Sequence, residues 1–401
     1  MDHHRTADYA GLAAALGDRA RHSLATMEQL GAAKAILLVG NDPTEQNPLA
    51  AWQIRAAIGH HGARLYALNA RPIKLRRKAS QFIPLSPGSE PAVCKWLAGG
   101  EGALDAALAA ALGALKTALE KESDLVIVFG AEVCAAATRD LVAFGLRLPG
   151  PTRFLALGDY ANSRGAADMG LLPDHLPGYA PVADFAARER FGTLWGASLP
   201  EQPGLAARPM LQAAAEGRLK ALYVVGANPV KTFRLTVGDR LGALELLVVQ
   251  EMFLTETAQR ADIVLPAACA YEKDGTVTNT AGEVQLLRKA GEAMGPRSDF
   301  DILRILAHQL GQRGLGRGIP WRAPEAVFEE IRRNVPGYDV SLANLLAGGA
   351  EPSAASWPGD SAAAILSADG IFSSGDTLFT SGSLGRYCTT MNSLPETQPK
   401  P

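Results

Sequence analysis

The chain has 401 residues, of which 47% are hydrophobic and 20% are charged, so it can build more than one packed core. Its formal net charge of −2 gives no long-range attraction to nucleic acid or to anionic lipid, and we expect neither as a partner. The most apolar stretch, residues 106–115, is far shorter than the ~20 residues of a membrane-spanning helix, so direct membrane insertion is not expected.

The first predicted structural unit follows a polar and alanine-rich N-terminus. This start has no apolar segment of the kind that directs secretion, so we expect a cytoplasmic protein. An apolar run at 35–39 leads into the turn Gly40-Asn41-Asp42-Pro43, and Pro48 suits the first position of a helix that Asn47 can cap. A second apolar run at 64–68 completes a strand–helix–strand unit.

The same pattern recurs twice further along the chain. An apolar run at 125–129 precedes Gly130, and another at 222–225 precedes Gly226-Ala227-Asn228-Pro229. Their partner strands are expected at 153–157 and 244–249. Runs of β-branched residues without polar alternation are typical of parallel strands covered by helices on both faces. The sequence therefore predicts an α/β fold with two doubly wound parallel-sheet units and right-handed crossovers.

Changes in composition divide the chain. Two repeats fall within residues 1–200, which we assign to a first α/β unit, and the third falls within a second unit at 201–335. Residues 336–369 are rich in Ala, Ser and Gly and are interrupted by Pro, which is typical of a linker. The last segment, 370–401, has β character but is too short for its own core, so we expect a short β tail.

The cysteines argue against a metal site on this chain. Iron-sulfur clusters and structural zinc need several thiolates on one ion, usually with a close pair from one loop. The four cysteines are far apart and form no C-x-x-C pair: they are Cys94, Cys134, Cys269 and Cys388. We therefore expect no bound metal and no cluster.

Several spaced motifs resemble those of the molybdopterin oxidoreductases. The turn at 40–48 resembles the first Gly-Asn-Pro module of this family, and 226–229 resembles the second. The most specific match runs from Glu256-Thr257-Ala258 through Ala-Asp-Ile-Val-Leu-Pro at 261–266 to the stretch Glu272 to Asn279. The resemblance implies two units like the central domains of formate dehydrogenases and DMSO reductases, with 370–401 as the start of their terminal β domain.

Within this family the sequence is most similar to the large iron-sulfur subunit of NADH:quinone oxidoreductase, respiratory complex I. The similarity lies at 41–45, 71–75 and 162–170. It implies that the partners are other subunits of the peripheral arm, including a cluster-bearing segment on another chain. It also implies a location on the cytoplasmic face of the inner membrane, through the complex.

The resemblance marks a candidate cofactor pocket. In family enzymes the two turns lie at strand carboxyl ends and bind the nucleotide arms of molybdopterin guanine dinucleotide. The corresponding positions here are Gly40, Asn41, Pro43, Gly226, Asn228, Pro229, Glu256, Thr257, Gly275 and Asn279.

Three departures from the family pattern weaken this pocket. Asp42 stands where the family has Asn, Asn69 stands where it has Asp, and Glu283 stands at a position that is usually cationic. An acid that faces a pyrophosphate is repulsive. We therefore expect vestigial strand-to-helix turns and no cofactor on this chain.

The family's metal ligand and cluster cysteines precede the first turn, and residues 1–39 contain no cysteine. We therefore expect no catalytic residue here. The preferred hypothesis is a structural subunit or fragment of complex I that supports electron transfer from NADH to quinone without its own redox centre. The alternative is part of a split, formate dehydrogenase-like enzyme, and only this alternative calls for molybdopterin guanine dinucleotide.

Overall fold

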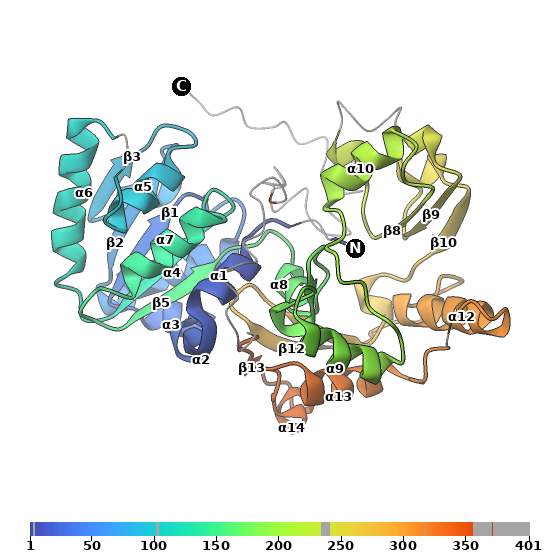
Figure 1. The fold of residues 1–401 in the computed structure, drawn as a ribbon. Helices are drawn as coiled ribbons and strands as arrows, with labels where there is room; N and C mark the ends of the chain where they lie inside the picture. Colours follow the sequence, from blue (N-terminus) through green and yellow to red (C-terminus); the bar gives the residue numbers. More distant parts are fainter. Residues whose placement is uncertain (3–4, 102–103, 234–240, 317, 356–370, 372–401) are drawn as a thin grey trace. The chain divides into compact units, whose positions relative to one another are not determined.

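The computed structural model describes residues 1–2, 5–101, 104–233, 241–316, 318–355 and 371. The chain forms two compact units, which we describe separately (Figure 1). The five-stranded unit comprises the described residues within 5–203 and 278–283 and from 352 onward. The three-stranded unit comprises those within 1–4, 204–277 and 284–351.

The core of the five-stranded unit is a parallel sheet with the strand order β3-β2-β1-β4-β5. The strands are β1 (Ala35–Val39), β2 (Arg64–Asn69), β3 (Gln81–Pro84), β4 (Leu125–Phe129) and β5 (Thr152–Ala156). Leu37 of β1 pairs with Tyr66 on one side and with Ile127 on the other. Every residue of β1 and β4 is buried, as the unbroken apolar runs predict.

Helices cover both faces of this sheet. On one face, Leu30 of α3 (Met27–Ala32) and Ile54 of α4 (Pro48–His61) belong to the same buried cluster as Leu38. On the other face, α7 (Ala136–Gly145) comes so close that a Cβ on Gly145 would lie 2.7 Å from the Phe154 ring. Helices on both faces make this sheet doubly wound.

The rest of the five-stranded unit is built from short elements. Phe191 of α9 packs in a small core beside the two-stranded antiparallel sheet β6-β7. The short elements of this unit are α1 (Tyr9–Leu16), η1 (Gly17–Arg19), α2 (Ala20–Ser23), η2 (Lys74–Lys78), α5 (Glu90–Leu97), α6 (Ala106–Leu119), α8 (Ser163–Asp168), β6 (His175–Leu176), η3 (Pro177–Tyr179), β7 (Ala180–Pro181) and α9 (Phe185–Trp195).

The three-stranded unit contains a smaller parallel sheet with the order β10-β9-β8. Its strands are β8 (Ala221–Val225), β9 (Leu246–Glu251) and β10 (Ile263–Pro266). Leu211 of α10 (Ala207–Ala215) packs with Val224 and Val249 on one face. On the other face, Tyr223 and Ile263 remain partly exposed.

The remaining elements all come after β8 in the sequence. They are α11 (Pro229–Thr232), η4 (Leu241–Ala243), η5 (Ala258–Arg260), η6 (Ala270–Glu272), β11 (Gly275–Thr278), β12 (Glu283–Leu287), α12 (Asp299–Gln312), α13 (Pro324–Asn334), α14 (Leu342–Leu346) and β13 (Glu351–Pro352). The last three strands form a sheet with the order β11-β12-β13. No helix in the described ranges has both the length and the hydropathy of a membrane span.

The α/β fold class with parallel sheets is confirmed, and the domain limits differ from the sequence division at several places. Residues 278–283 lie in the five-stranded unit although the sequence division put them in 201–335. The expected linker 336–369 is structured in its described part, where α14 buries Leu345 completely. Of the expected β tail at 370–401, all residues except Ile371 lie outside the described residues.

Candidate functional site

The candidate site lies where the strand order of the five-stranded sheet reverses. The chain proceeds from β1 through β2 to β3 on one side, and then returns to β4 and β5 on the other. The carboxyl ends of β1 and β4 are therefore neighbours, and Gly40 and Gly130 follow them directly. Doubly wound sheets bind their ligands at such a reversal.

The turn after β1 is held in a left-handed conformation. Gly40 has φ 65° and Asn41 has φ 56°, a region that Asn tolerates better than other side chains. The Asn69 amide donates to the Asn41 carbonyl at 2.7 Å. Its oxygen accepts from the Arg71 N–H at 2.9 Å. Asn69, which replaces the family's Asp, thus joins the turns after β1 and β2 with both ends of its amide.

Asn47 has another role than the one predicted. The sequence suggested that it caps α4, but its side chain makes no capping hydrogen bond. Instead its amide nitrogen donates to the Gly158 carbonyl at 2.8 Å, and its oxygen lies 3.4 Å from the Asn41 amide nitrogen. The prediction of Pro48 at the first helical position is confirmed. Asn47 therefore links the first turn to the end of β5.

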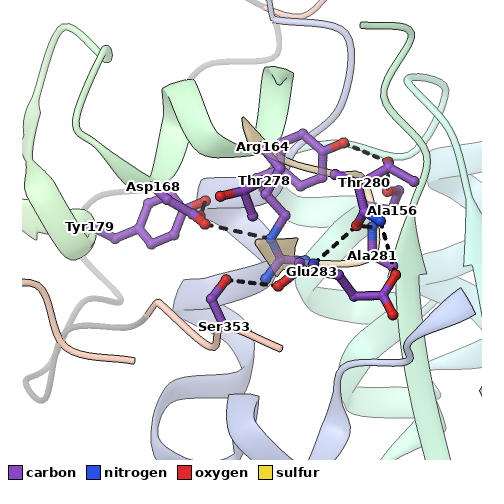
Figure 2. Close-up of polar contacts among 12 residues, drawn as sticks. Ala156, Arg164, Asp168, Tyr179, Thr278, Thr280, Ala281, Glu283 and Ser353 are labelled. Atoms are coloured by element: carbon purple, nitrogen blue, oxygen red, sulfur yellow. Dashed lines mark hydrogen bonds and ion pairs between the residues drawn. The ribbon is translucent and has the colours of Figure 1, made fainter. Parts of the chain in front are cut away.

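The loop 278–283 reaches the same end of β5 (Figure 2). The Thr280 hydroxyl donates to the Ala156 carbonyl and accepts from the Gly158 N–H, both at 2.9 Å. The Tyr9 hydroxyl lies 2.8 Å from the same oxygen, and burial raises the pKa of Tyr9 to about 12. Two motif segments that are far apart in the sequence, around Asn47 and Thr280, therefore meet at Gly158.

The same loop binds its own carboxylate. Asn279 donates to Glu283 Oε2 at 2.9 Å and accepts from the Ala281 and Glu283 N–H groups. The Ser353 hydroxyl donates to the Gly282 carbonyl at 2.8 Å and connects the loop to the chain that follows β13 (Figure 2). Asn279, a candidate for nucleotide binding, thus binds Glu283, the acid that stands at a usually cationic position.

The stretch 162–170, one of those that resemble complex I, contributes a buried pair. Arg164 and Asp168 of α8 lie 3.8 Å apart, and each side chain is at most 4% exposed. The Tyr179 hydroxyl donates to Asp168 at 2.5 Å. These residues stabilise the segment beside the loop 278–283 (Figure 2).

Glu132 is the site residue that sequence reasoning missed. A Cβ built on Gly40 would lie 2.9 Å from Glu132 Oε2, and one built on Gly130 would lie 2.8 Å from it. The carboxyl is therefore packed against both glycines. Burial raises its pKa, and hydrogen bonds from the N–H groups of Glu132 itself and of Asn41 only partly offset this. Its only sequence signal was its place two residues after Gly130.

The second turn, in the three-stranded unit, brings other predicted residues together. Asn228 donates to Glu256 at 2.6 Å and accepts from the Thr257 hydroxyl at 2.7 Å. The Thr257 oxygen also accepts from the Val230 N–H, so it anchors the start of α11, where Pro229 is the first residue. Gly226 has φ 58°, and a Cβ there would have no atom of the described residues within 4 Å.

The ten predicted positions thus fall into two groups. Gly40, Asn41, Pro43 and Asn279 belong to the five-stranded unit. Gly226, Asn228, Pro229, Glu256, Thr257 and Gly275 belong to the three-stranded unit. Gly275 is the first residue of β11 and is not among the residues that bond to Asn228.

Two of the three described cysteines have a raised thiol pKa. Burial raises the pKa of Cys94 to about 12 and that of Cys134 to about 11, so both stay protonated at neutral pH. Cys388 lies outside the described residues. Among the residues that the structure describes, no three His, Cys, Asp or Glu side chains are arranged to hold a metal.

The first turn does not fit the phosphate of a molybdopterin nucleotide. A phosphate would need backbone N–H groups and a cationic or neutral surrounding. Here the Gly40 N–H donates to the Leu68 carbonyl, and the Asp42 N–H donates to the Gln46 side-chain oxygen. Asp42 is a further carboxyl in this turn and is only 6% exposed. Two acids therefore stand where an anion would have to enter.

Comparisons with known proteins agree on one family. Residues 3–309 match the family model described as molybdopterin oxidoreductase. The chain is 35% identical over 92% of its length to the NADH-quinone oxidoreductase G 2 subunit of Rhizobium meliloti (strain 1021). It is 30% identical over 80% of its length to the putative formate dehydrogenase YrhE of Bacillus subtilis (strain 168). It spans 47% and 37% of these two relatives.

A solved structure supports the fold. Acetylene hydratase from Pelobacter acetylenicus has a TM-score of 0.50 at 16% identity, over 86% of this chain and 55% of that one. At this identity the likeness concerns the fold alone, which is the α/β fold described above. The sequence match covers more than half of the chain, so the chain belongs to the molybdopterin oxidoreductase family.

Proposed function

We propose that this chain is a structural part of the peripheral arm of an NADH:quinone oxidoreductase, complex I. In this role it packs against cluster-bearing segments on another chain at the cytoplasmic face of the inner membrane. It supports electron transfer from NADH to quinone without a redox centre of its own. The similarity to an NADH-quinone oxidoreductase subunit over 92% of the chain favours this assembly.

One observation carries the proposal: backbone N–H groups of the first turn donate within the protein. A turn that binds a nucleotide leaves N–H groups free for the phosphate. Here the Gly40 N–H donates to the Leu68 carbonyl at 2.9 Å, and the Asp42 N–H donates to the Gln46 side-chain oxygen at 3.3 Å. The hydrogen bonds of this turn therefore connect segments of the protein to one another, which suits a structural role.

The alternative is a part of a split, formate dehydrogenase-like enzyme. It is supported by the similarity to a putative formate dehydrogenase over 80% of the chain and by Gly226, where no described atom lies within 4 Å of a built Cβ. In that enzyme, Asn228, Glu256 and Thr257 would line the nucleotide arm of molybdopterin guanine dinucleotide. The cofactor would supply the redox chemistry, and these residues would only position it.

Isolation of the chain with its partners separates the two functions. We would tag the full chain in its source cells, purify the assembly under anaerobic conditions, and measure reduction of an artificial acceptor with NADH and with formate. We expect NADH-dependent activity, and iron that remains with the partner when the chains are separated. The same purification from untagged cells is the control.

Formate-dependent activity, with molybdenum or tungsten at about one atom per chain, would contradict the proposal and support the alternative. So would stoichiometric iron on the separated chain. Purification of a folded chain without any partner would also count against a scaffold role.

A further inference from the structure

We infer that an exposed surface formed by α4 and η2 docks an acidic segment of a partner protein. We call it the cationic surface, and its residues are Trp52, Arg55, Lys74, Arg76, Arg77 and Lys78. The inference goes beyond the proposed function, because it names a surface and the chemistry of what binds there. It holds for either kind of assembly.

The short helix η2 is fixed by apolar anchors while its cations point to solvent. Ile73 and Leu75 are buried in the same apolar cluster as Ile54 of α4. The Arg76 N–H donates to the Ile73 carbonyl at 3.0 Å, and the Ala79 N–H donates to the Arg76 carbonyl at 3.1 Å. The exposed cations of η2 are Lys74, Arg76, Arg77 and Lys78. A partner therefore meets a backbone that is already ordered, which lowers the cost of binding.

The helix α4 and η2 lie side by side on one face of the five-stranded sheet. Both contribute residues to one buried cluster on that face, and so does α3. α4 connects β1 to β2, and η2 connects β2 to β3, so η2 lies on the β3 side of α4. α3 comes from the β5 side, where the Ala25 N–H donates to the Phe154 carbonyl. α4 therefore lies between α3 and η2.

This arrangement places Arg55 on the flank of α4 that faces η2. Gln53 marks the flank that faces α3, because a Cβ on Gly31 of α3 would lie 2.3 Å from the Gln53 Oε1. Two helical residues later the direction has turned by about 200°, so Arg55 lies on the other flank. Arg55 is exposed and adds its charge to those of η2.

Trp52 supplies an apolar contact on the outer side of α4. Its side chain is 63% exposed, and Leu49, one turn earlier, is 74% exposed. Trp and Arg are among the residues that most often dominate binding at protein interfaces. A large apolar side chain beside several cations suits a partner segment that carries acidic and apolar residues together.

The cations of this surface have no acidic partner of their own. No ion pair joins any of them to an Asp or Glu in the part of the chain that the structure describes. Arg76 instead lies over the Phe82 ring, with its Cζ 5.3 Å from the ring centroid. Acids are not scarce, because the chain has 41 Asp and Glu against 39 Lys and Arg. Elsewhere in the same unit, Arg153 pairs with Asp124 at 2.6 Å.

A short acidic protein segment fits this surface better than a nucleic acid or a lipid bilayer. The net charge of −2 gives the chain no long-range attraction to an extended polyanion. A short acidic segment responds mainly to the nearest charges, because salt screens those more than about 10 Å away. Complementary charges of this kind give an interface its specificity and its rate of association.

Photo-crosslinking in the assembled state tests the inference. We would express the tagged full chain in its source cells with a photo-crosslinking amino acid in place of Trp52, and identify the captured segment by mass spectrometry. The same amino acid in place of Phe185, an exposed aromatic residue of the same unit, is the matched control. The surface is then altered by the triple change Lys74→Glu, Arg77→Glu and Lys78→Glu.

A second triple variant controls for the change in net charge. Lys95→Glu, Lys116→Glu and Lys121→Glu reverse three exposed lysines elsewhere in the same unit. Circular dichroism checks the fold of both variants. If the first triple variant does not fold, the same three positions are changed to Gln, which removes the charges without reversing them.

We expect position 52 to capture a protein segment that contains more Asp and Glu than Lys and Arg, and position 185 not to capture it. The first triple variant should lower the yield of this product at least about tenfold, because exposed ion pairs contribute up to about 1 kcal/mol each. The control triple variant should leave the yield unchanged. This result is expected whether the assembly oxidises NADH or formate, so it is separate from the test of the proposed function.

Four results would overturn the inference. They are capture of a neutral or basic segment, capture of nucleic acid or lipid in place of protein, an equal loss of yield in both triple variants, and no captured product at position 52.

Discussion

The two parallel sheets arise from the same repeated sequence pattern, yet they differ in burial. All five residues of β1 are buried, whereas in β8 only Val224 is, and Tyr223 and Val225 are 37% and 47% exposed. In the five-stranded unit, α3 and α4 cover one face and α7 covers the other. An apolar run therefore predicts a strand, but the helices around it decide how much that strand stabilises its unit.

The two Gly-Asn-Pro-like turns differ in the same sense. Gly40 is packed against Glu132, whereas a Cβ on Gly226 would meet no atom within 4 Å in the part of the chain that the structure describes. Asn41 is joined to the turn after β2, whereas Asn228 binds Glu256 and Thr257. The first turn is thus closed by its own side chains, and similar sequences do not imply similar capacity for a ligand.

Truncation of matched leucines tests the difference in burial with the largest expected effect. Leu38→Ala removes a fully buried side chain from β1 and should lower the free energy of unfolding of its unit by about 2–5 kcal/mol. Leu246→Ala in β9, where the side chain is 39% exposed, should cost less than about 1 kcal/mol. Amide hydrogen exchange in peptides from β1 and β9 reports each unit separately. Equal losses would contradict the contrast between the sheets.

Matched glycine substitutions test the turns. Both Gly40→Ala and Gly226→Ala place a side chain at positive φ, which costs about 1 kcal/mol. Gly40→Ala must also displace Glu132, so we expect a total loss of about 2–4 kcal/mol. The same hydrogen-exchange measurement applies. Adding Glu132→Ala should recover part of the Gly40→Ala loss, and no coupling between the two would show that the carboxyl does not lie against Gly40 in solution.

We expect the smallest difference in the free energy of unfolding from two ion pairs, one near the starts of β2 and β4 and the other near the starts of β8 and β9. Glu122 accepts from Arg64 and Tyr66 at 2.5–2.6 Å and its side chain is 2% exposed, whereas the Lys220–Glu245 pair is more than half exposed. Glu122→Gln should lower the free energy of unfolding by about 1–2 kcal/mol. The loss is limited to this range because the Arg64 side chain is half exposed, so solvent screens its charge. Glu245→Gln should cost little or nothing.

The pH dependence of the Glu122 contribution has a definite sign. Burial raises the pKa of Glu122, but the hydrogen bonds from Arg64 and Tyr66 outweigh burial, and the net pKa is lowered. The contribution is therefore fully present above the unfolded pKa of Glu, about 4.3, and is lost as pH falls through the lower folded value. The difference in the free energy of unfolding between wild type and Glu122→Gln, measured by urea unfolding from pH 7 to pH 3, should shrink as pH falls below about 4.3. A difference that stays the same from pH 7 to pH 3 would rule out this linkage.

From the sequence alone, six of the eight strands in the two parallel sheets and the family could be predicted, whereas β3 and β10 could not. The runs at 35–39 and 125–129 became β1 and β4 without a shift, because local apolar patterning needs no distant partner. It also identified Asn228, Glu256 and Thr257, which the structure brings together, because their spacing resembles a known motif.

Only the tertiary structure decided what those residues do. Glu132 could not be predicted as a site residue, because its contact with Gly40 depends on β1 and β4 being neighbours in the sheet. The two residues are 92 positions apart in the sequence. The placement of residues 278–283 in the five-stranded unit could not be predicted either, because it depends on the hydrogen bonds of Thr280 with Ala156 and Gly158. Neighbouring strands and docked loops arise from long-range packing, for which a sequence pattern has no local signal.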